Sequence, residues 1–201
     1  MRWIYWFGWM MMGSGFRSFF SMRVIGAEKL VTEGAVLVAS NHQSFLDPPL
    51  IGNLYDTEMW YLARKTLFRG VGGWLYPRWN AIPVDQDRPD MASLKTVIRL
   101  LKDNQRVLVF PEGERTLDGN LGVAQSGVGF VAVKAAAVIQ PVRIRGAREA
   151  LPRGSGRIRF ARITVTVGDP IRLTPEELEA YHSKDGYKAV TERIMAAIAA
   201  L

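Results

Sequence analysis

The chain has 201 residues, 48% of them hydrophobic and 22% charged, a composition that excludes a disordered chain and suits a single compact domain. It has no cysteine and two histidines, which excludes a disulfide framework and a thiolate metal site and argues against any transition-metal site. The net charge of +7 favours an anionic partner, which would be nucleic acid, a membrane surface or a phosphorylated substrate, but a solvated basic surface explains the charge equally well.

The first 22 residues differ in composition from the rest of the chain. They hold three tryptophans, four phenylalanines and five methionines, and Trp-rich segments favour the membrane–water interface. The longest uncharged run, from Trp3 to Phe16, has 14 residues, whereas a spanning helix needs about 20. We expect residues 1–22 to form an interfacial helix or helical hairpin, with an ordinary core-packing helix as the alternative, and residues 23–201 to form one domain.

From residue 23 onward, short apolar segments alternate with segments of helical periodicity. A final helical stretch begins at the capping box of Thr174 and Glu177, with Pro175 at the first helical position, and runs to Leu201. We expect strands at 35–40, 59–64, 81–84, 106–111 and 138–144, helices at 91–103 and 127–137, and a β-rich segment at 157–168. This alternation predicts an α/β fold, a layered α/β/α domain with a mixed, largely parallel central sheet.

The sequence SNHQSFLDPP follows the first of these strands and holds His42 and Asp47. In open α/β sheets, ligands gather beyond the carboxyl ends of the strands. Five residues on a helix rotate by about 140°, so the two side chains meet only if a turn lies between them. Asn41 and Ser44 favour such a turn, and Pro48 biases the aspartate away from helical geometry. The pair predicts a general base whose tautomer an acid fixes, although an aspartate that only caps the loop explains the spacing as well.

A second polar sequence, PEGERT, follows the expected strand at 106–111. Gly113 allows the backbone to approach a ligand closely. The guanidinium of Arg115 offers a planar fork that suits phosphate oxygens. This sequence therefore favours a phosphate-binding loop, with a charged β-turn that contains a local ion pair as the alternative.

Together, NHQSFLD and FPEGERT resemble the signature sequences of the glycerolipid acyltransferases, and specifically the 1-acylglycerol-3-phosphate acyltransferases, over residues 24–151. The resemblance implies that His42 and Asp47 are catalytic. In the family's second block the chain reads IPVDQD, with Gln86 where an arginine is expected, and we expect Arg88 to supply that cation. The substrate-binding residues that follow are Arg88, Glu112, Gly113, Arg115 and Thr116, with Pro141 from an apolar fourth block.

The resemblance further implies transfer of an acyl chain from a thioester, acyl-CoA or acyl carrier protein, to the free hydroxyl of 1-acylglycerol-3-phosphate, without a cofactor. The histidine would act as general base and the product would be phosphatidic acid. The lack of a G-x-S-x-G sequence and of cysteine agrees with direct transfer without an acyl-enzyme. The alternatives are another lysolipid acceptor, such as a lyso-ornithine lipid, a non-catalytic module that binds anionic lipid, and a nucleic-acid binder, for which no recognised motif is present.

Arginine is concentrated in residues 143–172, where two acids, Glu149 and Asp169, oppose eight arginines. Anionic lipid attracts each Lys or Arg near it by about 1 kcal/mol. Together with the aromatic N-terminal segment, this cluster predicts a peripheral or monotopic protein on the cytoplasmic face of the cytoplasmic membrane, with anionic lipid and not nucleic acid as its partner. The arginines are Arg143, Arg145, Arg148, Arg153, Arg157, Arg159, Arg162 and Arg172.

Overall fold

A computed structural model describes residues 3–85 and 91–201. Within these residues the chain forms a seven-stranded sheet in the order β1-β7-β6-β2-β5-β3-β4. Neighbouring strands run parallel, apart from β6 and β7, which are antiparallel. The strands are β1 (Arg23–Ile25), β2 (Val36–Ser40), β3 (Met59–Arg64), β4 (Ala81–Val84), β5 (Arg106–Val109), β6 (Val138–Arg145) and β7 (Thr164–Val167).

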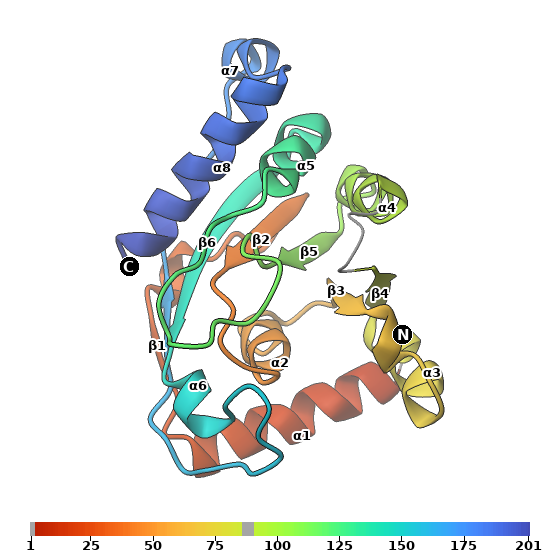
Figure 1. The fold of residues 1–201 in the computed structure, drawn as a ribbon, viewed down its shortest axis with the longest axis vertical. Coiled ribbons are helices and arrows are strands. Elements are labelled where there is room, and N and C mark those ends of the chain that lie inside the picture. Colours follow the sequence, from red (N-terminus) through yellow and green to blue (C-terminus); the bar gives the residue numbers. More distant parts are fainter. Residues whose placement is uncertain (1–2, 86–90) are drawn as a thin grey trace.

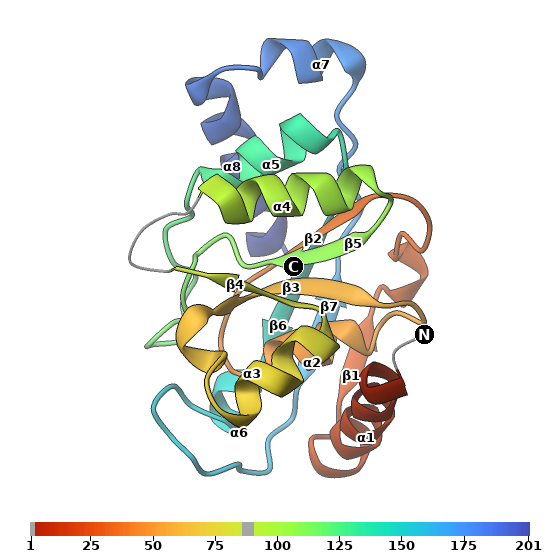
Figure 2. The same cartoon turned by 90° about the vertical axis from the view of Figure 1, so that its right-hand side faces the viewer.

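Helices cover both faces of the sheet, and two perpendicular views give the same layers (Figures 1 and 2). One face carries α4, α5 and α8, and the other carries α1, α2, α3 and α6. The expected layered α/β/α domain with a mixed, largely parallel sheet is confirmed. The helices are α1 (Trp3–Phe19), α2 (Asp47–Gly52), α3 (Val71–Leu75), α4 (Met91–Lys102), α5 (Gly127–Ala135), α6 (Ala147–Ala150), α7 (Pro175–Ala180) and α8 (Lys184–Ala199).

A buried apolar cluster lies on each face of the sheet, and β2 contributes to both. Val36 and Val38 belong to the cluster on the α1 and α2 side, whereas Leu37 and Ala39 belong to the cluster on the α4, α5 and α8 side. All five residues of β2 are buried. A central parallel strand is covered on both faces, so residues 36–39 of β2 are all apolar and do not alternate with polar residues. This is why the strand could be predicted from a short apolar run.

The carboxyl ends of β2 and β5 lie side by side. The two strands pair in parallel, with Ala39 opposite Val109. The chain therefore leaves both strands at the same edge of the sheet, and the loops that begin there carry SNHQSFLDPP and PEGERT. The fold brings these two sequences together although they lie about 70 residues apart.

The N-terminal segment forms one helix and not a hairpin. α1 has 17 residues and lies against α2. Its inner side buries Tyr5 and Phe16, and the indole N–H of Trp9 donates to the carbonyl oxygens of Gly52 and Tyr55, each at 3.1 Å. The exposed large apolar side chains of α1 are Trp3, Phe7, Met10, Met11 and, at its last residue, Phe19. Among the residues that the structure describes, no helix combines the length and hydropathy that crossing a membrane requires.

Two expected elements differ from those observed by more than one or two residues at an end. Only Thr164–Val167 of the β-rich segment forms a strand, and residues 157–160 are exposed, so their alternation of arginine and apolar side chains does not mark a buried sheet face. The C-terminal stretch is two helices, because Ser183 caps a new one by accepting the backbone N–H of Gly186 at 3.0 Å. The capping box of Thr174 and Glu177 is confirmed.

Candidate active site

His42 and Asp47 form a hydrogen-bonded pair just beyond the end of β2. Nδ1 of His42 lies 2.8 Å from Oδ2 of Asp47. The aspartate side chain is fully buried, whereas 16% of the histidine side chain is exposed. A proton on Nδ1, directed at the carboxylate, leaves Nε2 as the ring nitrogen that can accept a proton. The geometry is that of a general base oriented by an acid.

The same carboxylate builds the turn that brings the pair together. Oδ2 of Asp47 also accepts the backbone N–H of Gln43 (2.6 Å) and of Ser44 (2.7 Å). Asp47 is the first residue of α2, and Pro48 and Pro49 follow in its first turn. Proline is tolerated there because the backbone N–H groups of a first turn form no hydrogen bond within the helix. The two explanations considered for this aspartate, capping of the loop and orientation of the histidine, therefore hold together.

The loop after β5 is hydrogen-bonded to the backbone of His42. The buried carboxylate of Glu112 accepts the backbone N–H of His42 at Oε1 (2.9 Å) and that of Gly122 at Oε2 (2.6 Å). The backbone N–H of Thr116 donates to the carbonyl oxygen of His42 (2.9 Å). Gly113, between these two contacts, has φ 75°, a conformation that glycine adopts without strain. PEGERT thus holds both backbone polar groups of the histidine.

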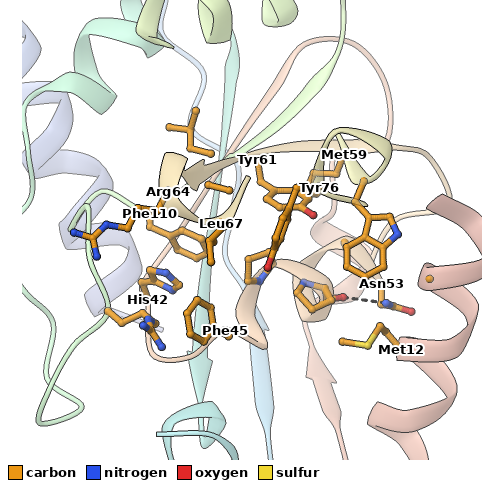
Figure 3. Close-up of a pocket in the computed structure, with 18 of the residues that line it drawn as sticks. Met12, His42, Phe45, Asn53, Met59, Tyr61, Arg64, Leu67, Tyr76 and Phe110 are labelled. Carbon is orange, nitrogen blue, oxygen red and sulfur yellow. Dashed lines mark hydrogen bonds between the residues drawn. The ribbon is translucent and has the colours of Figure 1, made fainter. Parts of the chain in front are cut away.

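A cavity of about 540 Å³ opens beside His42 and reaches α1. In Figure 3, His42 and Phe45 lie at one end, and Met12 and Asn53 lie beside α1 at the other. Most of the side chains along its length are apolar or aromatic, and they include Met59, Tyr61, Leu62, Leu67 and Tyr76. The cavity therefore offers an elongated apolar space that begins at the proposed base.

Arg115 lines the same cavity next to the loop of the histidine. Its guanidinium lies over the ring of Phe45, 3.7 Å from the centroid. Nη1 of Arg115 is buried and has no hydrogen-bond partner among the described residues. Burial lowers the pKa of Arg115, the nearby Arg153 lowers it further, and Asp47 acts in the opposite direction. A partly buried cation with an unpaired donor is suited to an anionic group of a ligand.

Three residues of the expected substrate-binding set are not among the described residues that line the cavity. Glu112 and Thr116 bind the backbone of the histidine, as described above, and Gly113 forms the turn between them. The hydroxyl of Thr116 donates to Oδ1 of Asp118 at 2.9 Å and so belongs to the next turn of the loop. In this structure these three residues contact the protein's own loops, which suits a positioning role.

Of the remaining two residues of that set, one is described and does not line the cavity, and the other lies outside the described residues. Pro141 lies buried inside β6, opposite Ala39 of β2, and is not among the described residues that line the cavity. Arg88, the expected second cation, lies outside the described residues, as does Gln86.

The cavity also includes residues that sequence reasoning did not assign to the site. Phe45 lies between His42 and Asp47 in the sequence, and this proximity was the available signal. Arg153 follows α6 and donates from Nη1 to the carbonyl oxygen of Arg115 (2.8 Å) and to Oε2 of Glu114 (3.0 Å). Nothing in the sequence distinguishes this arginine from the others in residues 143–172.

Comparisons with known proteins agree with this geometry. The family described as Acyltransferase matches residues 21–145. The chloroplastic 1-acyl-sn-glycerol-3-phosphate acyltransferase LPAT1 of Arabidopsis thaliana is 29% identical over 157 residues, which are 76% of this chain and 44% of that protein. The 1-acyl-sn-glycerol-3-phosphate acyltransferase of Bacillus subtilis (strain 168) is 26% identical over 182 residues, which are 86% of this chain and 84% of that protein.

A solved structure is also similar over nearly the whole chain. The crystal structure of the 1-acyl-sn-glycerophosphate (LPA) acyltransferase PlsC from Thermotoga maritima has a TM-score of 0.77 and 23% sequence identity, and the match covers 96% of this chain and 77% of that one. At this identity the likeness shows the fold. The chain spans less than half of the length of the Arabidopsis and Brassica napus relatives that it matches.

Proposed function

Because the Acyltransferase family covers residues 21–145, more than half of the chain, this protein belongs to that family, and we propose that it acylates the free hydroxyl of 1-acylglycerol-3-phosphate. The product is phosphatidic acid, and the reaction is a step of phospholipid biosynthesis. The acyl donor is a thioester, acyl-CoA or acyl carrier protein, and the reaction needs no cofactor beyond it. The names of the relatives described above support this choice of acceptor.

The observation that carries this proposal is the position of the His42–Asp47 pair at one end of the apolar cavity, beside Arg115. A base, an apolar space and a cation are the three features that a phosphate-bearing lipid alcohol needs. The base activates the hydroxyl, the apolar space holds a hydrocarbon chain, and the cation binds the phosphate.

The chemistry follows from the orientation of the histidine. Nε2 of His42 removes the proton from the acceptor hydroxyl while the oxygen attacks the thioester carbonyl carbon. The C–O bond of the new ester forms, the C–S bond breaks, and the imidazolium returns its proton to the departing thiolate. Because a thiol has a pKa near 8.5, the thiolate leaves with little help from an acid. Asp47 holds the tautomer and stabilises the imidazolium during this exchange.

The cavity accounts for the hydrocarbon part of the substrate. An acyl chain that enters between α1 and β3 contacts Met12, Met59 and Tyr61, with its carbonyl group at His42. Each buried methylene contributes about 0.8 kcal/mol of transfer free energy, so a chain of several carbons gains enough to offset the cost of ordering it.

The phosphate is assigned to Arg115. Its buried Nη1 lacks a partner among the described residues, and its stacking on Phe45 holds the guanidinium plane. A bidentate contact with phosphate oxygens would satisfy this donor and compensate for the burial that lowers the pKa of Arg115. The exposed aromatic side of α1 is assigned to the membrane surface, as a peripheral contact on the cytoplasmic face of the cytoplasmic membrane.

A product assay tests the function directly. Purified protein is supplied with acyl-CoA or acyl-loaded carrier protein, and with 1-acylglycerol-3-phosphate, 1-acylglycerol, lysophosphatidylcholine or lyso-ornithine lipid. Phosphatidic acid should form from the first acceptor, and the His42→Ala variant should form none. Preferred acylation of a neutral or amino-acid lysolipid would overturn the acceptor, and a lack of thioester consumption with every acceptor would overturn the enzymatic function.

A further inference from the structure

The arginine-rich residues 143–172 do not form a single surface. Arg143, on β6, donates to the carbonyl oxygen of Ala199 (2.5 Å), the last residue of α8, and Arg145 donates to that of Leu201 (2.6 Å), two residues beyond the helix. Cations at this position donate to carbonyl groups that a helix end leaves unpaired. They also interact favourably with the negative end of the helix dipole. These two arginines therefore stabilise the fold, and the basic surface that remains for a partner lies mainly in the loop after α6.

That loop, residues 152–162, carries apolar and basic side chains together on the surface. Ile158 is 65% exposed and Phe160 is 82% exposed. Arg157, Arg159 and Arg162 are exposed beside them, and residues 150–168 contain no acidic side chain. Large apolar side chains are costly to expose to water, and a basic setting suits the headgroup region of an anionic bilayer.

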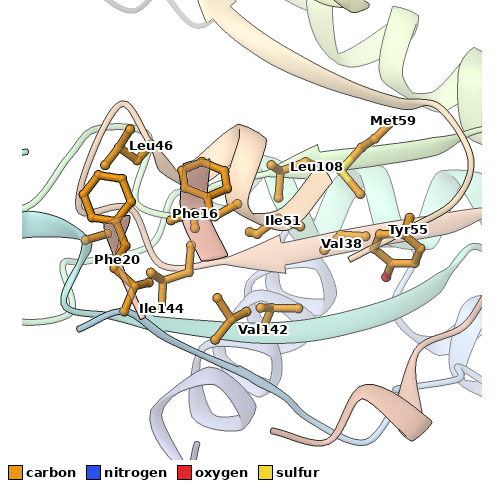
Figure 4. Close-up of a cluster of buried hydrophobic side chains, with 14 of the residues drawn as sticks. Phe16, Phe20, Val38, Leu46, Ile51, Tyr55, Met59, Leu108, Val142 and Ile144 are labelled. Atoms are coloured by element: carbon orange, nitrogen blue, oxygen red, sulfur yellow. The ribbon is translucent and has the colours of Figure 1, made fainter. Parts of the chain in front are cut away.

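The loop is attached to the body of the protein on both sides. The backbone N–H of Arg159 donates to the carbonyl oxygen of Ala150 in α6 (2.8 Å), and that of Ile163 donates to the carbonyl oxygen of Phe20 (3.1 Å). Phe20 is part of the buried cluster drawn in Figure 4. The exposed side chains of the loop therefore project from a fixed support.

The end of α1 continues the same surface. Phe19, the last residue of α1, is 58% exposed, and its ring lies 6.0 Å from that of Phe160 between centroids. Figures 1 and 2 both show the loop beside this end of the helix. The loop patch is defined here as Phe19, Ile158 and Phe160 with Arg157, Arg159 and Arg162.

We propose that the loop patch is a second membrane contact, in which Ile158 and Phe160 enter an anionic bilayer while the arginines bind lipid phosphates. The inference rests on the proposed function, because a lipid acceptor must pass from the bilayer to the cavity. Arg153, in the same loop, contacts Arg115 and Glu114 at the cavity. The loop thus connects the membrane surface to the site where the acceptor's phosphate is assigned.

Vesicle sedimentation with the full chain and without substrates tests the apolar part of the proposal. Vesicles contain phosphatidylglycerol and phosphatidylcholine, or phosphatidylcholine alone. The double substitution Ile158→Ser with Phe160→Ser should lower the partition coefficient on the anionic vesicles about tenfold or more, since each side chain loses its burial in lipid. Met91→Ser is the control, because Met91 is 53% exposed at the start of α4 on the opposite layer. Wild-type binding by the double variant would overturn the proposal.

The role of the arginines is tested with two triple variants that have the same net charge. Replacing Arg157, Arg159 and Arg162 by Gln should weaken binding to anionic vesicles at least about tenfold and reduce its salt dependence. Replacing the exposed cations of α4, which are Lys95, Arg99 and Lys102, by Gln should change binding less than about twofold. Equal losses in both triple variants would mean that net charge alone acts, and would contradict a specific loop patch.

A fluorescent probe on the loop measures insertion into the bilayer directly. Because the chain has no native cysteine, one introduced cysteine can be labelled selectively. Phe160→Cys, labelled with an environment-sensitive fluorophore, should shift to the blue on anionic vesicles, and labelled Met91→Cys should not. A label that stays in a water-like environment on anionic vesicles overturns the proposal. None of these measurements needs turnover, so an inactive protein would overturn the proposed function and leave this test intact.

Discussion

The imidazole of His42 lies flat on the ring of Phe110, with 3.8 Å between the centroids and 9° between the planes. The two residues follow β2 and β5, which are parallel neighbours, so the stack is a consequence of the sheet. It fixes the plane of the imidazole while Asp47 fixes its rotation, and an aromatic face also stabilises the imidazolium that forms when the base accepts a proton. Phe110 is therefore expected to matter for turnover.

Replacing Phe110 by Leu should lower kcat about tenfold with little change in KM, because the imidazole loses both its stacking surface and the stabilisation of its charged form. Phe110→Tyr keeps the ring face and should retain most activity. Steady-state kinetics on a detergent-dispersed acceptor give both parameters. An equal loss of kcat in the Leu and Tyr variants would show that stacking of the imidazole on the ring does not contribute to turnover.

Substitutions of His42 and of Asp47 should differ in their effects on stability. His42→Ala should lower kcat by roughly 10²- to 10⁴-fold and leave the melting temperature nearly unchanged, since the side chain lies at a cavity wall. Asp47→Ala should lose activity and stability together, because the N–H groups of Gln43 and Ser44 lose their acceptor. The other histidine, His182, is exposed, and His182→Ala is the control. A His42→Ala variant with near-normal turnover would exclude the mechanism.

Glu112 is expected to act through the backbone of His42. Glu112→Ala leaves the N–H groups of His42 and Gly122 without their acceptor and should reduce the free energy of unfolding by about 1–3 kcal/mol. It should reduce kcat as well, and Glu112→Gln, which keeps one carbonyl oxygen, should lie between Ala and wild type. Urea unfolding and kinetics are measured on the same samples. A raised acceptor KM with unchanged stability would instead indicate direct substrate contact.

Arg115→Ala should raise the KM for the phosphate-bearing acceptor about 10- to 100-fold and leave the KM for the acyl donor within about twofold. Arg115→Lys should recover little, because an ammonium group has neither the planar fork nor the stacking surface that Phe45 contacts. Arg148→Ala is a suitable control, since Arg148 donates to the carbonyl oxygen of Leu117 and is not among the described cavity residues. Unchanged kinetics in Arg115→Ala would assign the phosphate elsewhere.

The length of the cavity should set the preferred acyl chain. Met12 lies at the α1 end, and Met12→Trp should shorten the space there. Loss of about two buried methylenes corresponds to roughly a tenfold lower kcat/KM for a long-chain donor, while a short-chain donor should be used normally. Met11→Trp, on the exposed side of α1, is the matched control. The same chain-length profile in both variants would place the chain outside this cavity.

The sequence predicted the elements well where local patterns are strong. The strands β3 and β4 have the expected bounds, because apolar runs between turn residues mark strands that are covered by helices. The segment at 157–168 was predicted less accurately. Ile158 and Phe160 alternate with arginines as in a strand, but both side chains are exposed and these residues belong to no sheet. Local alternation does not distinguish a side chain that packs against protein from one that faces outward.

By itself, the sequence indicated the pairing of His42 with Asp47, the turn between them and the neighbouring PEGERT loop, since turn residues and strand ends are properties of short segments. Only the tertiary structure decided that Glu112 holds His42 by its backbone and that Phe110 lies against its ring. It also decided that α1, β3 and the loop of Arg153 surround one cavity. A cavity is the space left between elements packed from distant parts of the chain, and its lining therefore has no periodicity that the sequence could display.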